Sequence, residues 1–167
     1  MFEFSSEQEL FRETVRQLAL KEIAPHAKEI DETGTYPQGL RELLHSTGLF
    51  SLMLPAEYGG ADGSNVTFCI AVEELARVCG SSALVVLAHA VGLYPLVIGG
   101  SDSLKQEYYS AIAQDGVIAA FCLTEPEVGS DAASITTEAK LDGDHYILKD
   151  INQSNNLLTY YEQYRII

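Results

Sequence analysis

The chain has 167 residues, 47% of them hydrophobic, which is enough for one domain with a real core, or for one domain and part of a second. Ten basic residues against 24 acidic residues give a formal net charge of −14, which argues against nucleic acid and against an anionic membrane surface as partners, because both attract basic patches. The three cysteines and four histidines show no CxxC spacing and no His-x-x-x-His spacing, so we interpret the cysteines as reduced thiols and expect no metal site.

The chain begins with the signals of α-helices. Ser6 and Glu9 have the spacing of a capping box ahead of an apolar face, so a helix is expected to begin there. Pro25 should end or kink this helix, because proline lacks a backbone N–H. A further short helix is expected to end at Gly48, and an apolar stretch and a long turn follow it.

Three more helices are expected after that turn. Ser64 is a candidate N-cap for the first of them, and Gly80 should stop it. The apolar run Ala83–Ile98 is interpreted as a buried core helix, because it is shorter than the roughly 20 residues that a membrane span needs. Ser101 or the residue after it should cap the last helix. Five or six helices joined by short loops are typical of an antiparallel bundle.

The pattern changes to that of β-structure near residue 117. Val117–Leu123 is expected to form a strand, because apolar and β-branched residues dominate it. Thr136–Leu141 and His145–Lys149 flank the dipeptide Asp142-Gly143, which is a good signal for a β-hairpin. Three strands are too few to close a core of their own.

The predicted fold class is therefore mainly α, with more than one domain. We predict an antiparallel helical bundle over residues 1–116, followed by the beginning of an antiparallel β-sheet or barrel-like domain over residues 117–150. Residues 151–167 form an unmatched tail.

The segment from Phe121 to Asp131 carries the most information about function. It presents the hydroxyls of Thr124 and Ser130, and Gly129 allows close approach to the backbone because it has no Cβ. Successive N–H groups in such a turn can form a concave site for an anion. From the residues alone, the favoured interpretation is that the two hydroxyls cap their own turns.

As a string, Cys122–Asp131 resembles the flavin-binding signature of the acyl-CoA dehydrogenase family. Three weaker stretches support the resemblance because they occur in the same order: Leu54–Gly60, Glu73–Ala76 and Gly100–Tyr108. The resemblance runs from the N-terminus to about Lys149. It implies FAD-dependent α,β-dehydrogenation of an acyl-CoA thioester, in a protein with an N-terminal helical domain, a middle β domain and a C-terminal helical bundle.

Carried over by position, the resemblance implies flavin contacts for five residues. The backbone of Phe121 and Leu123 would line the pyrimidine edge of the flavin, and Thr124 would offer its N–H and hydroxyl there. Gly129 and Ser130 would serve the pyrophosphate of FAD. These contacts form the predicted cofactor site.

The resemblance also implies contacts with the substrate. Ser130 would lie near the pantetheine arm of the acyl-CoA. Leu93, Tyr94 and Val97, on the apolar helix, are candidates for a wall of the fatty-acyl cavity. Core packing is an equally good interpretation of these three, because an apolar stripe on a helix is core by default.

No residue is assigned as the catalytic base. In the family a glutamate of the C-terminal bundle has that role, and nothing in this sequence matches it. Glu73 and Glu74 are neighbours in sequence and do not share a helix face, so we interpret both as solvated rather than as an acid/base pair. Because residues 151–167 do not follow the family pattern, we expect a truncated N-terminal portion of an acyl-CoA dehydrogenase that does not turn over alone.

The expected partners are an acyl-CoA substrate, an electron-transfer flavoprotein and, in the complete family, further copies of the same chain. Two alternatives stay open: a non-catalytic remnant or interaction module, and a related acyl-CoA oxidase or flavin monooxygenase. The N-terminus has early acidic residues and no targeting pattern. It favours a prokaryotic cytoplasm, or the mitochondrial matrix for a processed organellar protein.

Overall fold

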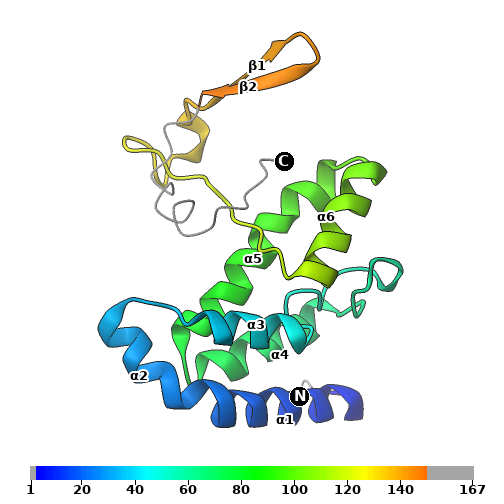
Figure 1. The fold of residues 1–167 in the computed structure, drawn as a ribbon, viewed down its shortest axis with the longest axis vertical. Coiled ribbons are helices and arrows are strands. Elements are labelled where there is room, and N and C mark those ends of the chain that lie inside the picture. Colours follow the sequence, from blue (N-terminus) through cyan, green and yellow to red (C-terminus); the bar gives the residue numbers. More distant parts are fainter. Residues whose placement is uncertain (1–2, 150–167) are drawn as a thin grey trace. The chain divides into compact units, whose positions relative to one another are not determined.

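The computed structural model describes residues 3–149, and side chains as far as residue 147, so the predicted tail 151–167 lies outside the described residues. The chain divides into two units, one ending at Ala119 and the other beginning at Ala120 (Figure 1). The domain boundaries proposed above, after residues 116 and 150, stay predictions.

The first unit is helical and confirms the predicted bundle. Helix α4 packs against both α1 and α5, and the apolar core lies between these helices and the loop that follows α3 (Figure 1). The α-helices are α1 (Ser6–Leu18), α2 (Ala24–Thr33), α3 (Gln38–Ser46), α4 (Asn65–Ala76), α5 (Gly80–Gly99) and α6 (Asp102–Asp115). A π-helical segment, Ala19–Ile23, joins α1 to α2, and a short 3-10 helix, Ala56–Tyr58, precedes α4.

The first helix begins one residue earlier than predicted. The Ser5 hydroxyl accepts a hydrogen bond from the Gln8 N–H at 3.2 Å, and the Gln8 side chain accepts one from the Ser5 N–H at 3.0 Å. This is a capping box, and the sequence offers it twice because Ser6 and Glu9 have the same spacing. Pro25 lies in the first turn of α2, where its missing N–H breaks no α-helical hydrogen bond. The predicted end of the first helix before Pro25 is seen as a change of helix type, because α1 ends at Leu18 and the π-helical segment leads without a gap into α2.

Ser64 caps α4 as predicted, because its hydroxyl accepts a hydrogen bond from the Thr67 N–H at 3.1 Å. The expectation that Gly80 stops this helix is wrong. Helix α4 ends at Ala76, the backbone turns extended at Cys79 (φ −152°, ψ 106°), and Gly80 is the first residue of α5.

Helix α5 is therefore longer than the apolar run suggested. It has 20 residues, and within the described residues it is the one helix whose length and composition would allow it to cross a membrane. The argument from length against a span was wrong. Its buried residues Ala83, Val86, Leu93 and Leu96 belong to the apolar core of the first unit, so the interpretation as a buried core helix is confirmed for one face of α5 only.

The segment Val117–Leu123 is not a strand, contrary to the prediction. Val117, Ile118 and Ala119 instead pack as extended chain against the core of the first unit. The Ala119 N–H donates to a histidine side chain of α5, so it has no need of a neighbouring strand.

The second unit contains one antiparallel hairpin within the described residues, made of β1 (Glu138–Asp142) and β2 (His145–Lys149). Asp142 pairs with His145, so the two-residue turn is Gly143-Asp144 rather than Asp142-Gly143. Gly143 has φ 65° at the first central position, as glycine does in a type II′ turn. The hairpin was predicted, but its turn lies one residue later.

Candidate functional site

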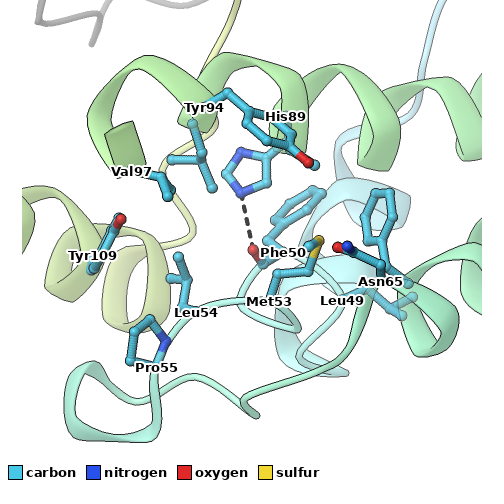
Figure 2. Close-up of a pocket in the computed structure, with 13 residues that line it drawn as sticks. Leu49, Phe50, Met53, Leu54, Pro55, Asn65, His89, Tyr94, Val97 and Tyr109 are labelled. Carbon is cyan, nitrogen blue, oxygen red and sulfur yellow. Dashed lines mark hydrogen bonds between the residues drawn. The ribbon is translucent and has the colours of Figure 1, made fainter. Parts of the chain in front are cut away.

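An apolar cavity of about 310 Å³ lies beside α5 in the first unit. Its walls come from α5, from the loop after α3, from the start of α4 and from α6 (Figure 2). Leu49, Phe50 and Leu54 from the loop face Leu93 of α5 and Tyr109 of α6. Its size and apolar lining are those of a site for a small hydrophobic group.

Glycine fixes the shape of the loop that forms one wall. Gly59 has φ 86°, a conformation that other residues rarely adopt. A Cβ at Gly60 would collide with the backbone of Leu54, so the chain can fold back here only with glycine. This turn holds Leu54 and Pro55 at the cavity, which gives a structural reason for the stretch Leu54–Gly60.

The three predicted acyl-cavity residues all line this cavity. Leu93 is 6% exposed and is mainly a core residue, whereas Tyr94 and Val97 are 52% and 50% exposed. The structure therefore brings them together without deciding between core packing and substrate contact, and their role in binding stays a prediction.

A second apolar face of α5 was missed in the sequence. Leu84, Leu87 and Val91 are spaced as one helix face and are 61%, 40% and 37% exposed. A helix that is apolar on all sides must expose part of its surface unless it is buried all round. The signal in the sequence was the apolar run, which carries apolar residues on every side of the helix.

The cavity also contains a buried histidine that sequence reasoning left without a role. His89 is 2% exposed, and its Nε2 lies 3.0 Å from the Phe50 carbonyl oxygen (Figure 2). Its Nδ1 accepts a hydrogen bond from the Ala119 N–H at 2.9 Å. Burial lowers the pKa of His89 to about 4, so the ring is neutral at physiological pH. A lone polar residue in an apolar run was the available signal.

The predicted flavin loop is built around a tight turn in the second unit. Glu125 and Val128 exchange two backbone hydrogen bonds, of 3.0 and 3.2 Å, with Pro126 and Glu127 at the corner. Phe121 and Leu123, which precede the turn, are 44% and 38% exposed. The loop thus presents apolar side chains next to a rigid turn.

Glu125 joins this turn to the segment just before β1. Its carboxylate accepts hydrogen bonds from the Thr136 N–H at 2.9 Å and hydroxyl at 2.6 Å, and from the Thr137 N–H at 2.7 Å and hydroxyl at 2.6 Å. The side chain is 4% exposed. These bonds, led by that of the Thr136 side chain, lower the pKa of Glu125 to about 2. Nothing in the sequence pattern indicated this contact, because the two threonines lie outside the motif.

The loop leaves donors free for a ligand. Within the described residues, no protein hydrogen bond is made by the N–H groups or the hydroxyls of Thr124 and Ser130, nor by the N–H of Gly129. The interpretation that the two hydroxyls cap their own turns is therefore wrong; the carboxylate of Asp131 accepts from the Ser134 hydroxyl at 2.6 Å instead. A Cβ on Gly129 would meet no atom, so there is open space at that position. Free N–H donors beside open space suit the pyrophosphate of FAD.

Glu74 is not solvated, contrary to our interpretation, although Glu73 is exposed. The carboxylate of Glu74 is 2% exposed and pairs with Arg16 at both oxygens, with Nε at 3.0 Å and Nη2 at 2.7 Å. The hydrogen bond from Arg16 is the main cause of the lowered pKa of Glu74. The pair joins α1 to α4 and has a structural role.

In the part of the chain that the structure describes, no three His, Cys, Asp or Glu side chains are grouped as a metal site. Within the described residues, Cys69, Cys79 and Cys122 form no disulfide, and Cys79 is the buried one of the three.

Comparison with known proteins gives one family. Residues 5–115 match the model of the acyl-CoA dehydrogenase N-terminal domain. The probable acyl-CoA dehydrogenase FadE25 of Mycobacterium tuberculosis is 43% identical over 148 residues, which is 89% of this chain and 38% of the relative.

Solved structures agree with this family. The structure of glutaryl-coenzyme A dehydrogenase with glutaryl-CoA is similar with a TM-score of 0.81 and 28% identity, over 90% of this chain and 39% of that one. An acyl-CoA dehydrogenase from Bacillus anthracis complexed with FAD is similar with a TM-score of 0.78 and 29% identity, over 89% of this chain and 26% of that one. The chain thus spans about two fifths or less of the length of these proteins.

Proposed function

This chain belongs to the acyl-CoA dehydrogenase family, and on that basis we propose that its protein oxidises the α,β carbon–carbon bond of an acyl-CoA thioester with FAD as cofactor. The observation that carries the proposal is the length of the stretch that aligns with the relative. An aligned stretch that covers 148 residues of a 167-residue chain must include the loop 121–131. Because the chain spans 38% of that relative, the activity is proposed for the whole protein, to which this chain contributes the helical unit and the flavin loop.

The residues of the loop fit an anionic cofactor. The free N–H groups of Gly129 and Ser130 would donate to the pyrophosphate, and such local donors are needed because the net charge of −14 repels an anion at long range. Thr124 would orient the pyrimidine edge with its N–H and hydroxyl, and the backbone of Phe121 and Leu123 would line that edge. When bound, FAD supplies the hydride-accepting chemistry.

The acyl group is proposed to lie along α5. The cavity beside Leu93, Tyr94 and Val97 is one place for it, and the exposed face of Leu84 and Leu87 is the other. Both are apolar, so acyl-CoA binding by variants distinguishes them: Leu93→Ala weakens binding if the cavity holds the chain, and Leu87→Asp does so if the outer face holds it.

The catalytic base is proposed to lie outside this chain. Among residues 3–147, the buried carboxylates are Glu74 and Glu125, and hydrogen bonds lower the pKa of each. A carboxylate that is held ionised by fixed donors is a weak base and is not free to approach a substrate. We propose for the same reason that this chain alone does not turn over substrate.

The proposed partners are an acyl-CoA thioester, an electron-transfer flavoprotein and a second copy of the complete chain. These partners follow from the family resemblance, which is also compatible with a related acyl-CoA oxidase or flavin monooxygenase; oxygen consumption by the complete protein would favour one of these two. The proposed location is the cytoplasm of a prokaryote, or the mitochondrial matrix for a processed organellar protein.

A titration of the purified chain with FAD tests the proposal. We expect a saturable rise in flavin fluorescence anisotropy, and about fivefold weaker binding in Thr124→Ala and in Ser130→Ala, the effect of one hydrogen bond. Ser46→Ala removes an exposed hydroxyl far away in sequence and should bind as the wild type does. Addition of an acyl-CoA should leave the visible flavin spectrum unbleached. No saturable anisotropy change would contradict the proposal and favour the non-catalytic remnant.

A further inference from the structure

We propose that His89 is a positioning residue that joins the wall of the apolar cavity to the backbone entering the flavin loop. The contact itself lies within the first unit. The statement that the loop binds flavin rests on the proposed function.

The imidazole of His89 bridges two segments that are far apart in sequence. From α5 it donates to the Phe50 carbonyl, 39 residues earlier, and accepts from the Ala119 N–H, 30 residues later. A carbonyl can only accept and an N–H can only donate, so these partners allow only the neutral tautomer with the proton on Nε2. The ring is thereby fixed at both nitrogens.

Loss of the ring would leave both backbone groups without their partner. Phe50 is 2% exposed, and Ala119 packs against the core. A buried backbone group without a hydrogen-bond partner destabilises the fold, so the ring restrains both segments.

The Ala119 end of the bridge sets where the chain leaves the first unit. Phe121 follows two residues later, so its Cα lies within roughly 7 Å of the Cα of Ala119, whatever the direction of the chain. The first predicted flavin contact is thereby tethered to a point that His89 fixes.

The Phe50 end of the bridge belongs to the cavity. Phe50 and His89 both line it, their ring centroids are 5.2 Å apart, and Leu93 lines it one turn further along α5 (Figure 2). One side chain therefore connects the wall of an acyl-sized space with the residue at which the first unit ends.

Two conservative variants separate the two halves of the bridge. In His89→Asn the amide oxygen takes the place of Nδ1 and keeps the bond to Ala119, whereas in His89→Gln the amide nitrogen takes the place of Nε2 and keeps the bond to Phe50. The readout is amide hydrogen exchange of Ala119, measured by NMR in the full chain. His26→Gln changes an exposed histidine and is the matched control.

We expect the protection of the Ala119 amide to fall at least tenfold in His89→Gln and to stay within about threefold of the wild type in His89→Asn and in the control. Unchanged protection in His89→Gln would overturn the proposal. The wild-type imidazole gives a test without any variant: ¹⁵N shifts at pH 7 should show a protonated Nε2 and a bare Nδ1, and the opposite tautomer would overturn the proposal as well.

FAD titration of the same samples tests the link to the flavin. We expect weaker FAD binding in His89→Gln than in His89→Asn, by at least threefold. Equal binding in the two variants, with Ala119 protection lost only in His89→Gln, would overturn the positioning role. A wild-type chain that binds no FAD would refute the proposed function and the link to flavin with it, and the exchange data would still report on the contact with Ala119.

Discussion

The helical unit and the flavin-loop unit are stabilised by opposite means. All buried hydrophobic residues among residues 3–147 lie between Val15 and Ile112, in the helical unit. From residue 120 to residue 147 one residue is buried, and it is the carboxylate Glu125. In the described part of the chain, the helical unit is held by apolar burial, whereas the second unit is held by hydrogen bonds, those to the Glu125 carboxylate and those of the hairpin.

This difference explains why the two units suit different tasks. A close-packed core keeps a cavity open at a fixed place, because its walls cannot relax freely. A loop clasped by one carboxylate keeps its other N–H groups unpaired and available for a ligand. The apolar side chains of the hairpin, such as Leu141, Tyr146 and Ile147, stay more than half exposed and contribute no core.

The largest expected effect contrasts leucines of the two units. Leu75→Ala, at a position with 0% exposure, should lower the free energy of unfolding by about 2 to 5 kcal/mol through lost burial and a cavity. Leu141→Ala, at a position 66% exposed, should change it by less than about 0.5 kcal/mol. Urea unfolding followed by circular dichroism measures both. Similar losses at the two positions would remove the contrast between the units.

The second effect is acid destabilisation of the helical unit by His89. Its pKa is lowered from 6.5 to about 4 in the folded chain, so the unfolded chain binds the proton more readily. The stability from the neutral ring is present above pH 6.5 and is lost as the pH falls towards 4, by about 3 kcal/mol. The other titratable side chains that line the cavity are the phenols of Tyr94 and Tyr109.

Urea unfolding at pH 7 and at pH 4 measures this loss. His89→Asn has no imidazole and is the control, because every other titratable residue is the same in both proteins. The same pH dependence in wild type and variant would show that His89 is not buried in its neutral form.

The third effect concerns the pair between Arg16 and Glu74. Arg16→Ala leaves the 2% exposed carboxylate without its main partner and should cost about 2 kcal/mol, less than for a fully buried pair because Arg16 is 30% exposed and Arg77 stays 3.7 Å away. Lys28→Ala breaks an exposed pair with Glu32 and should cost less than about 1 kcal/mol. Thermal unfolding compares them; equal costs would place Glu74 in solvent.

The smallest effect on global stability is expected at Glu125, where the change is local. Its pKa of about 2 means that the hydrogen bonds to Thr136 and Thr137 persist above pH 4.5 and are lost as the pH falls through 2. In Glu125→Gln the amides of both threonines should exchange faster while those of α4 are unchanged; Glu127→Gln, at an exposed position, is the control. An NMR titration midpoint near 4.5 for Glu125 would contradict the hydrogen bonds from Thr136 and Thr137 to its carboxylate.

Local signals in the sequence predicted local structure well. Serine caps, helix-ending glycines and the hairpin dipeptide gave the six helices and the hairpin, with errors of one residue at Ser5 and at Gly143. Gly80 was misplaced because the preceding helix ends through an extended Cys79 rather than through glycine. The one-residue errors at Ser5 and Gly143 occur because two neighbouring residues satisfy the same rule.

Long-range pairs were out of reach of the sequence. The partners of Glu74 and His89 lie 58 and 39 residues away, and no periodicity marks them. The run Val117–Leu123 has the composition of a strand, but its first residues pack against the core and the Ala119 N–H donates to His89 rather than to a neighbouring strand. The predicted flavin contacts could be named only through the resemblance to a family signature, because unpaired N–H groups leave no mark in a sequence.

The most direct test of the central claim is NMR mapping of FAD on the ¹⁵N-labelled chain. The account predicts that FAD shifts the amide signals of residues 121–131, with the largest changes at Thr124, Gly129 and Ser130, and leaves those of α1 and α2 in place. Shifts confined to the helical unit, or no shifts at saturating FAD, would contradict it.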